Sequence, residues 1–327
     1  MWKISGYAIV GLIALLAIYV VIGGLVFNQM LNRILVVGSG TDLAAAGQPA
    51  SSPYDLAYRG DPKVAFGFDF QSVSIATDGG GAPAWVVPPP GPPQDVWAIF
   101  VHGIAGAREG GYRYLPALRA AGFTTLLITY RNDKEAPKSA DGIYSFGLTE
   151  WPDLDAAVAY ALEHGAAEVI IAADSMGGGV LGQFLKHSQH TNRVQALLMD
   201  APALDFPAVA RAIAASFRLP LASVLAGTAE RMFSLQHGLN LAEAVSVPEV
   251  AAFSGPIMLV HGEGDRIVPI GISKHLLATR FGDTVFLRTH ADHLLSRAED
   301  PERYDRLLRA FLDALQRTEK RGAAAPL

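Results

Sequence analysis

Short apolar segments alternate with helical patterns along most of the chain, and this alternation most limits the folds open to it. Strand candidates such as "VWAIFVH", "AEVIIAA" and "PIMLVHG" are nearly continuous apolar runs, as in parallel strands covered on both faces. Between them lie helical patterns such as "WPDLDAAVAYALEHG", several of which end at a glycine suited to a helix C-cap. Eight strand candidates in this arrangement predict a doubly wound, mostly parallel α/β sheet with helices on both faces.

Length and composition allow one large domain. Half of the 327 residues are apolar and 17% are charged, which suffices for a large core and argues against disorder. The net charge of -5 is spread without a basic block, so nothing favours a nucleic-acid partner. The chain has no cysteine, which excludes disulfides and thiolate metal sites and fits a reducing or an oxidising compartment.

The first residues differ from the rest. From Ile4 to Phe27 the chain carries no charge, and a helix over this stretch would measure about 36 Å, more than a bilayer core. A cleaved signal peptide would have a shorter apolar region with a small-residue cleavage site, and "GGLVFNQM" offers no clear one. We therefore expect a single-pass transmembrane anchor at residues 1–30. The amino terminus and Lys3 on one side of this segment, against Arg33 on the other, predict that the body lies on the extracytoplasmic side.

Three further segments complete the expected organisation. Residues 31–57 include "GSGTDLAAAGQPASSP" and read as a flexible linker, followed by a folded domain at 58–318 and a disordered tail at 319–327. The interval at about 205–254 is too long for one crossover helix, which predicts a helical cap insertion. Its apolar stretches could pack on the sheet or cover a hydrophobic site.

Ser175 stands between a strand candidate and a glycine-rich helix start in "EVIIAADSMGGGV". The order strand, x-S-x-G, helix is typical of a nucleophile elbow, where small neighbours are needed because the turn is tight. Ala173 takes the place of the usual first glycine. The alternative is a serine that only caps the helix.

Two polar side chains follow the last strand candidates, Asp265 after "PIMLVHG" and His293 after "TVFLRTH". A serine hydroxyl needs an imidazole to accept its proton and a carboxylate to fix the tautomer of that imidazole. The sequence therefore predicts that Ser175, Asp265 and His293 form a catalytic triad.

Neighbouring groups leave alternatives open. Glu263 or Asp200 could serve as the acid, although the turn "GDRIVP" favours Asp265, and His290 could compete with His293 as the base. Asp174 is expected to point away from the nucleophile, on the surface or behind the reacting groups.

An oxyanion hole is expected beside the serine. The strand "WAIFVH" ends at His102, so the next turn can direct the N–H of Ile104 to the point that the N–H of Met176 faces. We expect His102 to brace this loop without reacting. The sequence has no pair of histidines at metal-ligand spacing together with a cluster of carboxylates, so no metal is expected. No cofactor is expected either.

Stretches such as "VHGIAG", "ITYRND", "LLMDAPALDF", "LVHGEGDRIVP" and "HADH", within about residues 60–315, resemble the α/β hydrolase superfamily. They are most similar to the serine hydrolases of the BEM46/ABHD13-like and S33-aminopeptidase-like (Hydrolase_4) grouping. The resemblance implies Ser175 as nucleophile, Asp265 as acid, His293 as base, and Ile104 with Met176 as oxyanion donors. "HADH" and Ala173 depart from the family pattern.

The expected activity is that of a membrane-anchored serine hydrolase, a carboxylesterase or lipase acting through an acyl-enzyme on a small-molecule or lipid-like acyl ester. A thioesterase or a serine peptidase-like amidase is the alternative within this fold. A catalytically silent, membrane-tethered binding protein is the alternative from another class. Opening of haloalkanes or epoxides is disfavoured because it needs a carboxylate at position 175.

Overall fold

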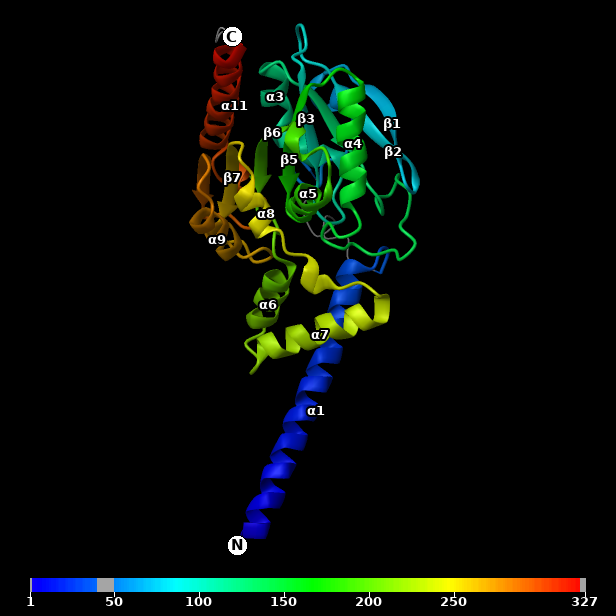
Figure 1. Ribbon diagram of the computed structural model, residues 1–327, viewed down its shortest axis with the longest axis vertical. Helices are drawn as coiled ribbons and strands as arrows, with labels where there is room; N and C mark the ends of the chain where they lie inside the picture. The colour runs from blue at the N-terminus through cyan, green and yellow to red at the C-terminus, as the bar shows by residue number, and fades with distance from the viewer. Residues whose placement is uncertain (1, 40–49, 324–327) are drawn as a thin grey trace.

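The computed structural model describes residues 2–39 and 50–323, and an eight-stranded sheet forms its centre (Figure 1). The strand order is β1-β2-β4-β3-β5-β6-β7-β8; β1 and β2 are antiparallel to their neighbours, and the other pairs are parallel. The predicted mostly parallel sheet is confirmed. The strands are β1 (Gln71–Thr77), β2 (Gly80–Val87), β3 (Val96–Val101), β4 (Thr124–Ile128), β5 (Glu168–Asp174), β6 (Val194–Asp200), β7 (Ile257–Gly262) and β8 (Thr284–Thr289).

Helices cover both faces of the sheet because the central strands are apolar on both sides. Every residue of β3, β4 and β7 is buried, whereas the edge strand β1 is mostly exposed. One face packs against α4 (Trp151–Glu163), α5 (Met176–His187), α8 (Val247–Ala252) and α9 (Gly271–Thr279); the other packs against α3 (Leu115–Ala120) and α11 (Pro301–Ala323). The short helices α2 (Pro62–Phe66) and α10 (Ser296–Glu299) complete the body.

Strand register brings the candidate site residues to one edge of the sheet. The last residue of β5, Asp174, pairs with Asp200 at the end of β6, and Gly262 of β7 pairs with Thr289 of β8. The segments that follow these strands therefore leave the sheet at the same carboxyl edge, which is where open α/β sheets bind ligands.

The expected cap insertion is helical. After β6 come α6 (Phe206–Ser216) and α7 (Ala222–His237), which stand off the sheet beside α1, and then α8, which packs on the sheet. The packing of α8 on the sheet is one of the two possibilities that the sequence left open for this interval, whereas a cover over a hydrophobic site stays a prediction.

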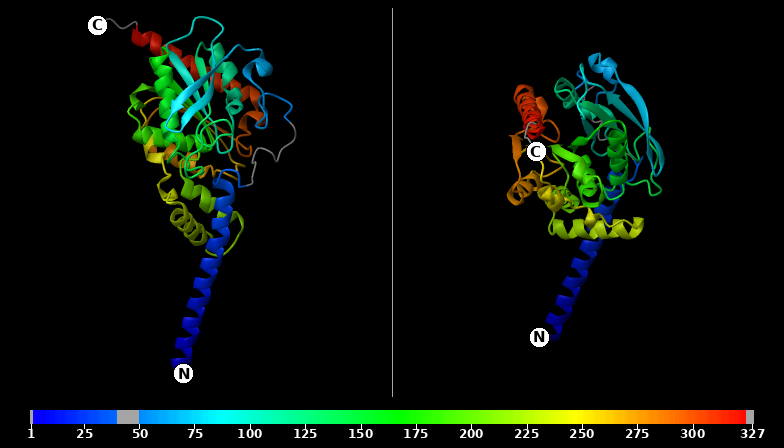
Figure 2. Two further views of the ribbon diagram at one scale, coloured as in Figure 1. Left: turned by 90° about the vertical axis from the view of Figure 1, so that its right-hand side faces the viewer. Right: turned by 45° about the horizontal axis from the view of Figure 1, so that its top comes forward.

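Helix α1 (Trp2–Leu35) is one continuous helix that projects from the body (Figures 1 and 2). Every side chain from Tyr7 to Ile18 is exposed, whereas Leu35 is completely buried. Of the helices in the described ranges, only α1 has the length and composition of a membrane span, features that a signal sequence near the N-terminus shares.

Helix α1 extends beyond the expected anchor at residues 1–30. The helix continues to Leu35, whose carbonyl accepts a hydrogen bond from the N–H of Tyr144, and Val36 forms a β-bridge with Ile143. The start of the expected linker is therefore folded into the domain, since its apolar side chains reach the core. Residues 40–49 of that linker lie outside the described residues.

The expected disordered tail also begins too early. Helix α11 continues to Ala323, with only residues 324–327 outside the described range.

Candidate active site

Ser175 occupies a strained turn between β5 and α5. Its backbone has φ 52° and ψ -120°, a conformation that is costly for a residue with a Cβ atom and that persists only when the surroundings enforce it. Gly177 is required here because a Cβ atom on it would collide with the carbonyl oxygens of Val101 and His102. Gly103 likewise lies so close that its Cβ would stand 2.9 Å from that of Ser175.

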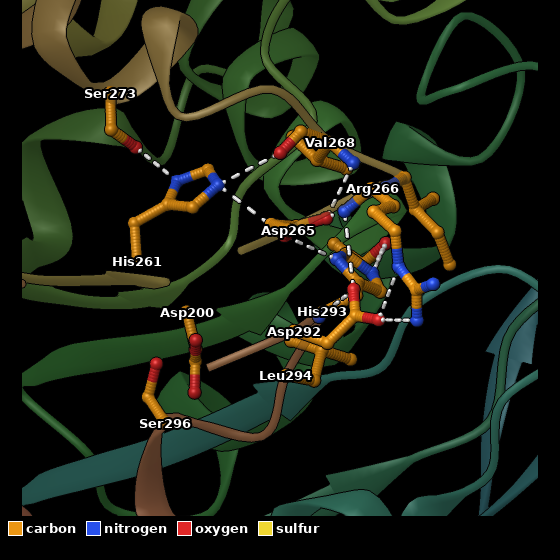
Figure 3. A network of polar contacts seen from close by, with 12 residues as sticks. Asp200, His261, Asp265, Arg266, Val268, Ser273, Asp292, His293, Leu294 and Ser296 are labelled. Carbon is orange, nitrogen blue, oxygen red and sulfur yellow. Dashed lines mark hydrogen bonds and ion pairs between the residues drawn. The ribbon is translucent and has the colours of Figure 1, made fainter. Parts of the chain in front are cut away.

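The structure brings the three predicted side chains into one chain of contacts. Ser175 Oγ lies 2.9 Å from His293 Nε2, and His293 Nδ1 lies 2.7 Å from Asp265 Oδ2. Figure 3 shows Asp265 and His293 facing one another across the loops that follow β7 and β8. The other carboxylate oxygen, Oδ1, accepts hydrogen bonds from the N–H groups of Ile267 and Val268, at 2.9 and 2.8 Å.

These contacts favour an ionised Asp265. Burial alone would raise the pKa of Asp265, but hydrogen bonds from His261, His293 and the N–H of Val268 hold the pKa well below its usual value. A carboxylate in this state can accept a hydrogen bond from the Nδ1–H of His293, which leaves Nε2 free to accept a proton.

His261 is a neighbour that the sequence reasoning did not single out. It is fully buried at the end of β7, with Nε2 at 3.4 Å from Asp265 Oδ2 and 2.9 Å from the carbonyl oxygen of Val268 (Figure 3). Its Nδ1 lies 2.7 Å from the hydroxyl of Ser273, which can donate to it. A polar residue in the apolar run "PIMLVHG" was the signal that could have revealed it.

The competing residues have other partners. Glu263 faces Arg288 and His290, at 3.5 and 3.2 Å, and His290 is largely exposed. Asp200 is fully buried, with Oδ2 3.3 Å from Nη1 of Arg113. Geometry therefore places Asp265, rather than Glu263 or Asp200, against the imidazole of His293.

A buried network of ion pairs and hydrogen bonds supports the turn at Ser175 from the interior of the protein. Arg113 is bonded to Asp174 and, at 2.8 Å, to the carbonyl oxygen of Leu294, the residue after His293. The hydroxyl of Tyr114 also donates to Asp174, at 2.7 Å. Asp174 is thus not a surface residue, which corrects one of the two positions expected for it. The guanidinium connects the serine turn with the histidine loop.

Burial of this network shifts its acids. Desolvation raises the pKa of Asp200 to about 7, because Arg113 compensates it only in part and Asp174 repels it. Oδ1 of Asp200 has no hydrogen-bond partner among the described residues. Asp174, which receives two hydrogen bonds, also has a pKa raised by burial.

The expected oxyanion donors belong to two segments that adjoin Ser175, one along the chain and one through Gly103. Met176 is the first residue of α5, where N–H groups have no partner within the helix. Ile104 follows Gly103, the residue in contact with Ser175. Within the described part of the chain, the backbone N–H groups of Ile104 and Met176 donate no hydrogen bond.

His102 braces the loop that carries Ile104. Its Nε2 lies 2.8 Å from Asp133, its Nδ1 lies 2.8 Å from the carbonyl oxygen of Gly103, and its ring stacks on Tyr130. Burial lowers the pKa of His102, but the carboxylate of Asp133 outweighs this effect and raises it overall. Metal-binding groups of three or more His, Asp or Glu side chains are not found in the part of the chain that the structure describes.

Solved structures share this architecture, although no protein-family model and no curated protein sequence matches the chain. The Pyrococcus furiosus esterase Pf2001 superposes with a TM-score of 0.60 at 18% identity, over 82% of this chain and 99% of the esterase. An esterase from Pyrobaculum calidifontis gives 0.55 at 18% identity, over 77% of this chain and 86% of its own.

A puromycin-hydrolyzing peptidase from Mycobacterium tuberculosis gives a TM-score of 0.59 at 17% identity, over 79% of this chain and 40% of the peptidase. At these identities the likeness concerns the fold. The chain has the α/β hydrolase fold, as expected.

Proposed function

We propose that this protein is a serine hydrolase held at a membrane by α1, and that it cleaves carboxylic esters through an acyl-enzyme. The observation that carries the proposal is the unbroken contact from Asp265 through His293 to Ser175, with the serine in a strained turn. Two of the proteins with this fold are esterases by description, which favours an ester substrate. Assignment to the BEM46/ABHD13-like grouping stays a prediction.

In the first half-reaction, Ser175 Oγ attacks the carbonyl carbon of the ester while its proton passes to His293 Nε2. Asp265 accepts a hydrogen bond from the Nδ1–H of His293 and stabilises the imidazolium that forms. The carbonyl oxygen becomes an oxyanion, which the N–H groups of Ile104 and Met176 would bind. Each such donor is worth about 3 kcal/mol in the transition state.

Collapse of the tetrahedral intermediate breaks the bond to the alcohol, which takes the proton from His293 and leaves. A water molecule then gives a proton to His293 and attacks the acyl carbon. The second intermediate then collapses, the bond between the acyl carbon and Ser175 Oγ breaks, and Oγ takes the proton from His293 as the acid leaves. No step requires a cofactor or metal.

The proposed substrate is an acyl ester, either small or lipid-like, near the bilayer that α1 would span. The same residues could cleave a thioester or an amide, and the similar fold of a peptidase makes the amide worth testing. We propose the extracytoplasmic side for the body, which protease protection in intact cells would test.

A fluorophosphonate probe tests the proposal directly, because it labels serines that are activated as nucleophiles. Purified protein in detergent should be labelled, and Ser175→Ala should abolish labelling. Ser296→Ala is the matched control, since Ser296 is a buried serine near the site whose hydroxyl bonds that of Thr289 at 2.9 Å. p-Nitrophenyl esters of increasing acyl length would then define the substrate range. A folded sample without labelling or hydrolysis would support the binding-protein alternative.

A further inference from the structure

The turn between α6 and α7, which we call the cap loop (Phe217–Leu221), exposes apolar side chains. Phe217, Leu219 and Leu221 are 50%, 44% and 47% exposed, and Val224 in the next turn is 47% exposed. Large apolar side chains gathered in this way are unusual on a surface that faces only water, and they mark contact with another apolar phase.

Helix α1 holds the cap loop in place. The hydroxyl of Tyr19 donates a hydrogen bond to the carbonyl oxygen of Pro220 at 2.7 Å, and the rings of Phe27 and Phe217 meet edge to face at 5.5 Å. Figure 1 shows the cap helices on the side of the body from which α1 projects. The cap loop is therefore fixed beside α1 at the level of Tyr19.

The length of the uncharged part of α1 determines how far along the helix a bilayer would extend. The segment from Ile4 to Tyr19 spans only about 23 Å at 1.5 Å per residue, whereas a bilayer core measures about 30 Å. The next residues, up to Phe27, are uncharged. A bilayer spanned by α1 thus extends past Tyr19, to the level at which the cap loop lies.

Charge in the cap agrees with this position. Residues 206–238 contain Arg211, Arg218 and Arg231 against one acid, Glu230, although the whole chain is acidic. The three arginines are exposed, whereas Glu230 is mostly buried. Exposed arginines beside apolar side chains suit a surface of anionic lipid headgroups.

The cap is directly connected with the candidate site. The N–H of Ala203, three residues before α6, donates to the carbonyl oxygen of Ser175 at 2.9 Å. Phe206 at the start of α6 packs on Phe146, whose carbonyl oxygen lies against Gly179 of α5. Helix α6 alone, about 16 Å long, separates this contact from the cap loop.

We propose that the cap loop inserts into the lipid bilayer next to α1, so that the edge of the sheet with Ser175 faces the membrane and lipid esters reach it from the bilayer. This inference rests on α1 being a membrane span. The inserted side chains are Phe217, Leu219 and Leu221, and Arg218 contacts the headgroups.

Depth-dependent fluorescence quenching tests the insertion. Because the natural chain has no cysteine, single cysteines can be labelled uniquely with a polarity-sensitive fluorophore. We would place them at Ile13 on exposed α1, at Leu219 in the cap loop, and at Phe281, which is fully exposed before β8 at the opposite edge of the sheet. The full chain is reconstituted in phosphatidylcholine and phosphatidylglycerol vesicles with and without acyl-chain nitroxide lipids.

We expect strong quenching at position 13, at least twofold quenching at position 219, and none at position 281. Quenching at 13 with equal values at 219 and 281 would overturn the insertion of the cap loop while leaving the membrane span in place. Absence of quenching at 13 would overturn both.

Activity separates this inference from the proposed hydrolase. Leu219→Glu should lower hydrolysis of a long-chain ester in vesicles at least tenfold and leave hydrolysis of soluble p-nitrophenyl acetate unchanged, while Phe281→Glu should change neither. Equal vesicle activity of Leu219→Glu and the natural protein would overturn the inference. Absence of activity on both substrates in the natural protein would instead contradict the proposed function, and quenching would still decide the insertion.

Discussion

His261 and His293 approach the same oxygen of Asp265, one at 3.4 Å from the interior and the other at 2.7 Å from the site. The inner histidine thereby fixes the carboxylate on which the outer one depends. A group that acts through another residue in this way affects the rate without touching the substrate.

His261→Ala should therefore lower kcat for a short p-nitrophenyl ester about tenfold, roughly 1.4 kcal/mol, with little change in KM. Without its hydrogen bond the carboxylate of Asp265 is less well stabilised, so the acidic limb of the pH–rate profile should move as well. Ser273→Ala removes only the hydroxyl that bonds Nδ1 of His261, on the side away from Asp265, and should have a smaller effect. Natural kcat and an unmoved profile in His261→Ala would refute this role.

Asp265→Asn and His293→Ala should each lower kcat about 10⁴-fold, because the first gives the wrong tautomer of the imidazole and the second removes the base. Glu263→Gln and His290→Asn are the matched controls, since these residues bond each other outside the site. Steady-state hydrolysis measures all four variants. A large loss in either control would return that residue to the list of catalytic candidates.

Stability should depend on pH through Asp200. Its folded pKa of about 7 lies above the ordinary value, so the folded state binds an extra proton between about pH 4 and 7. The stabilisation of the folded state by this proton is complete below the ordinary pKa of an aspartate, and it is lost as the pH rises through 7.

The free energy of unfolding of Asp200→Asn, minus that of the natural protein, should therefore rise by about 2 kcal/mol from pH 5 to pH 8. Urea unfolding in detergent at the two pH values measures the difference. Asp69→Asn removes an exposed carboxylate and should leave the difference at zero. Parallel pH profiles of Asp200→Asn and the natural protein would contradict the raised pKa.

The contact of α1 with α7 should depend on glycine. A Cβ atom at Gly24 would stand 2.5 Å from Thr228 Cγ2, so Gly24→Leu should push the helices apart and cost about 1–3 kcal/mol. Gly11→Leu is the matched control because nothing lies within 4 Å of its Cβ position. Thermal unfolding in detergent compares the two, and equal midpoints would show that the contact tolerates a side chain.

The sequence could predict the strands and the three site residues because each residue lies in the segment that follows a strand, within four residues of its end. In parallel strands the carboxyl ends share an edge, so local placement in the chain translates into closeness in space. Asp265 could be chosen over Glu263 from the turn that follows it.

Contacts between residues that lie far apart in the sequence could not be predicted in this way. Arg113 joins Asp174 with the histidine loop across the fold, and no local pattern marks a buried arginine. Gly23 and Gly24 read as part of an apolar run, because their role depends on α7, about 200 residues later. The contact of Leu35 with Tyr144 was hidden for the same reason.

The burial of Leu35 has a consequence for the range over which the protein can work. A loose tether would let a domain swing through a wide volume above its membrane and sample dissolved molecules. Here the helix enters the domain as a rigid stem, so with α1 in a bilayer the orientation of the body is fixed relative to that surface. Encounters then become a two-dimensional search, in which lateral diffusion sets how often Ser175 meets a substrate.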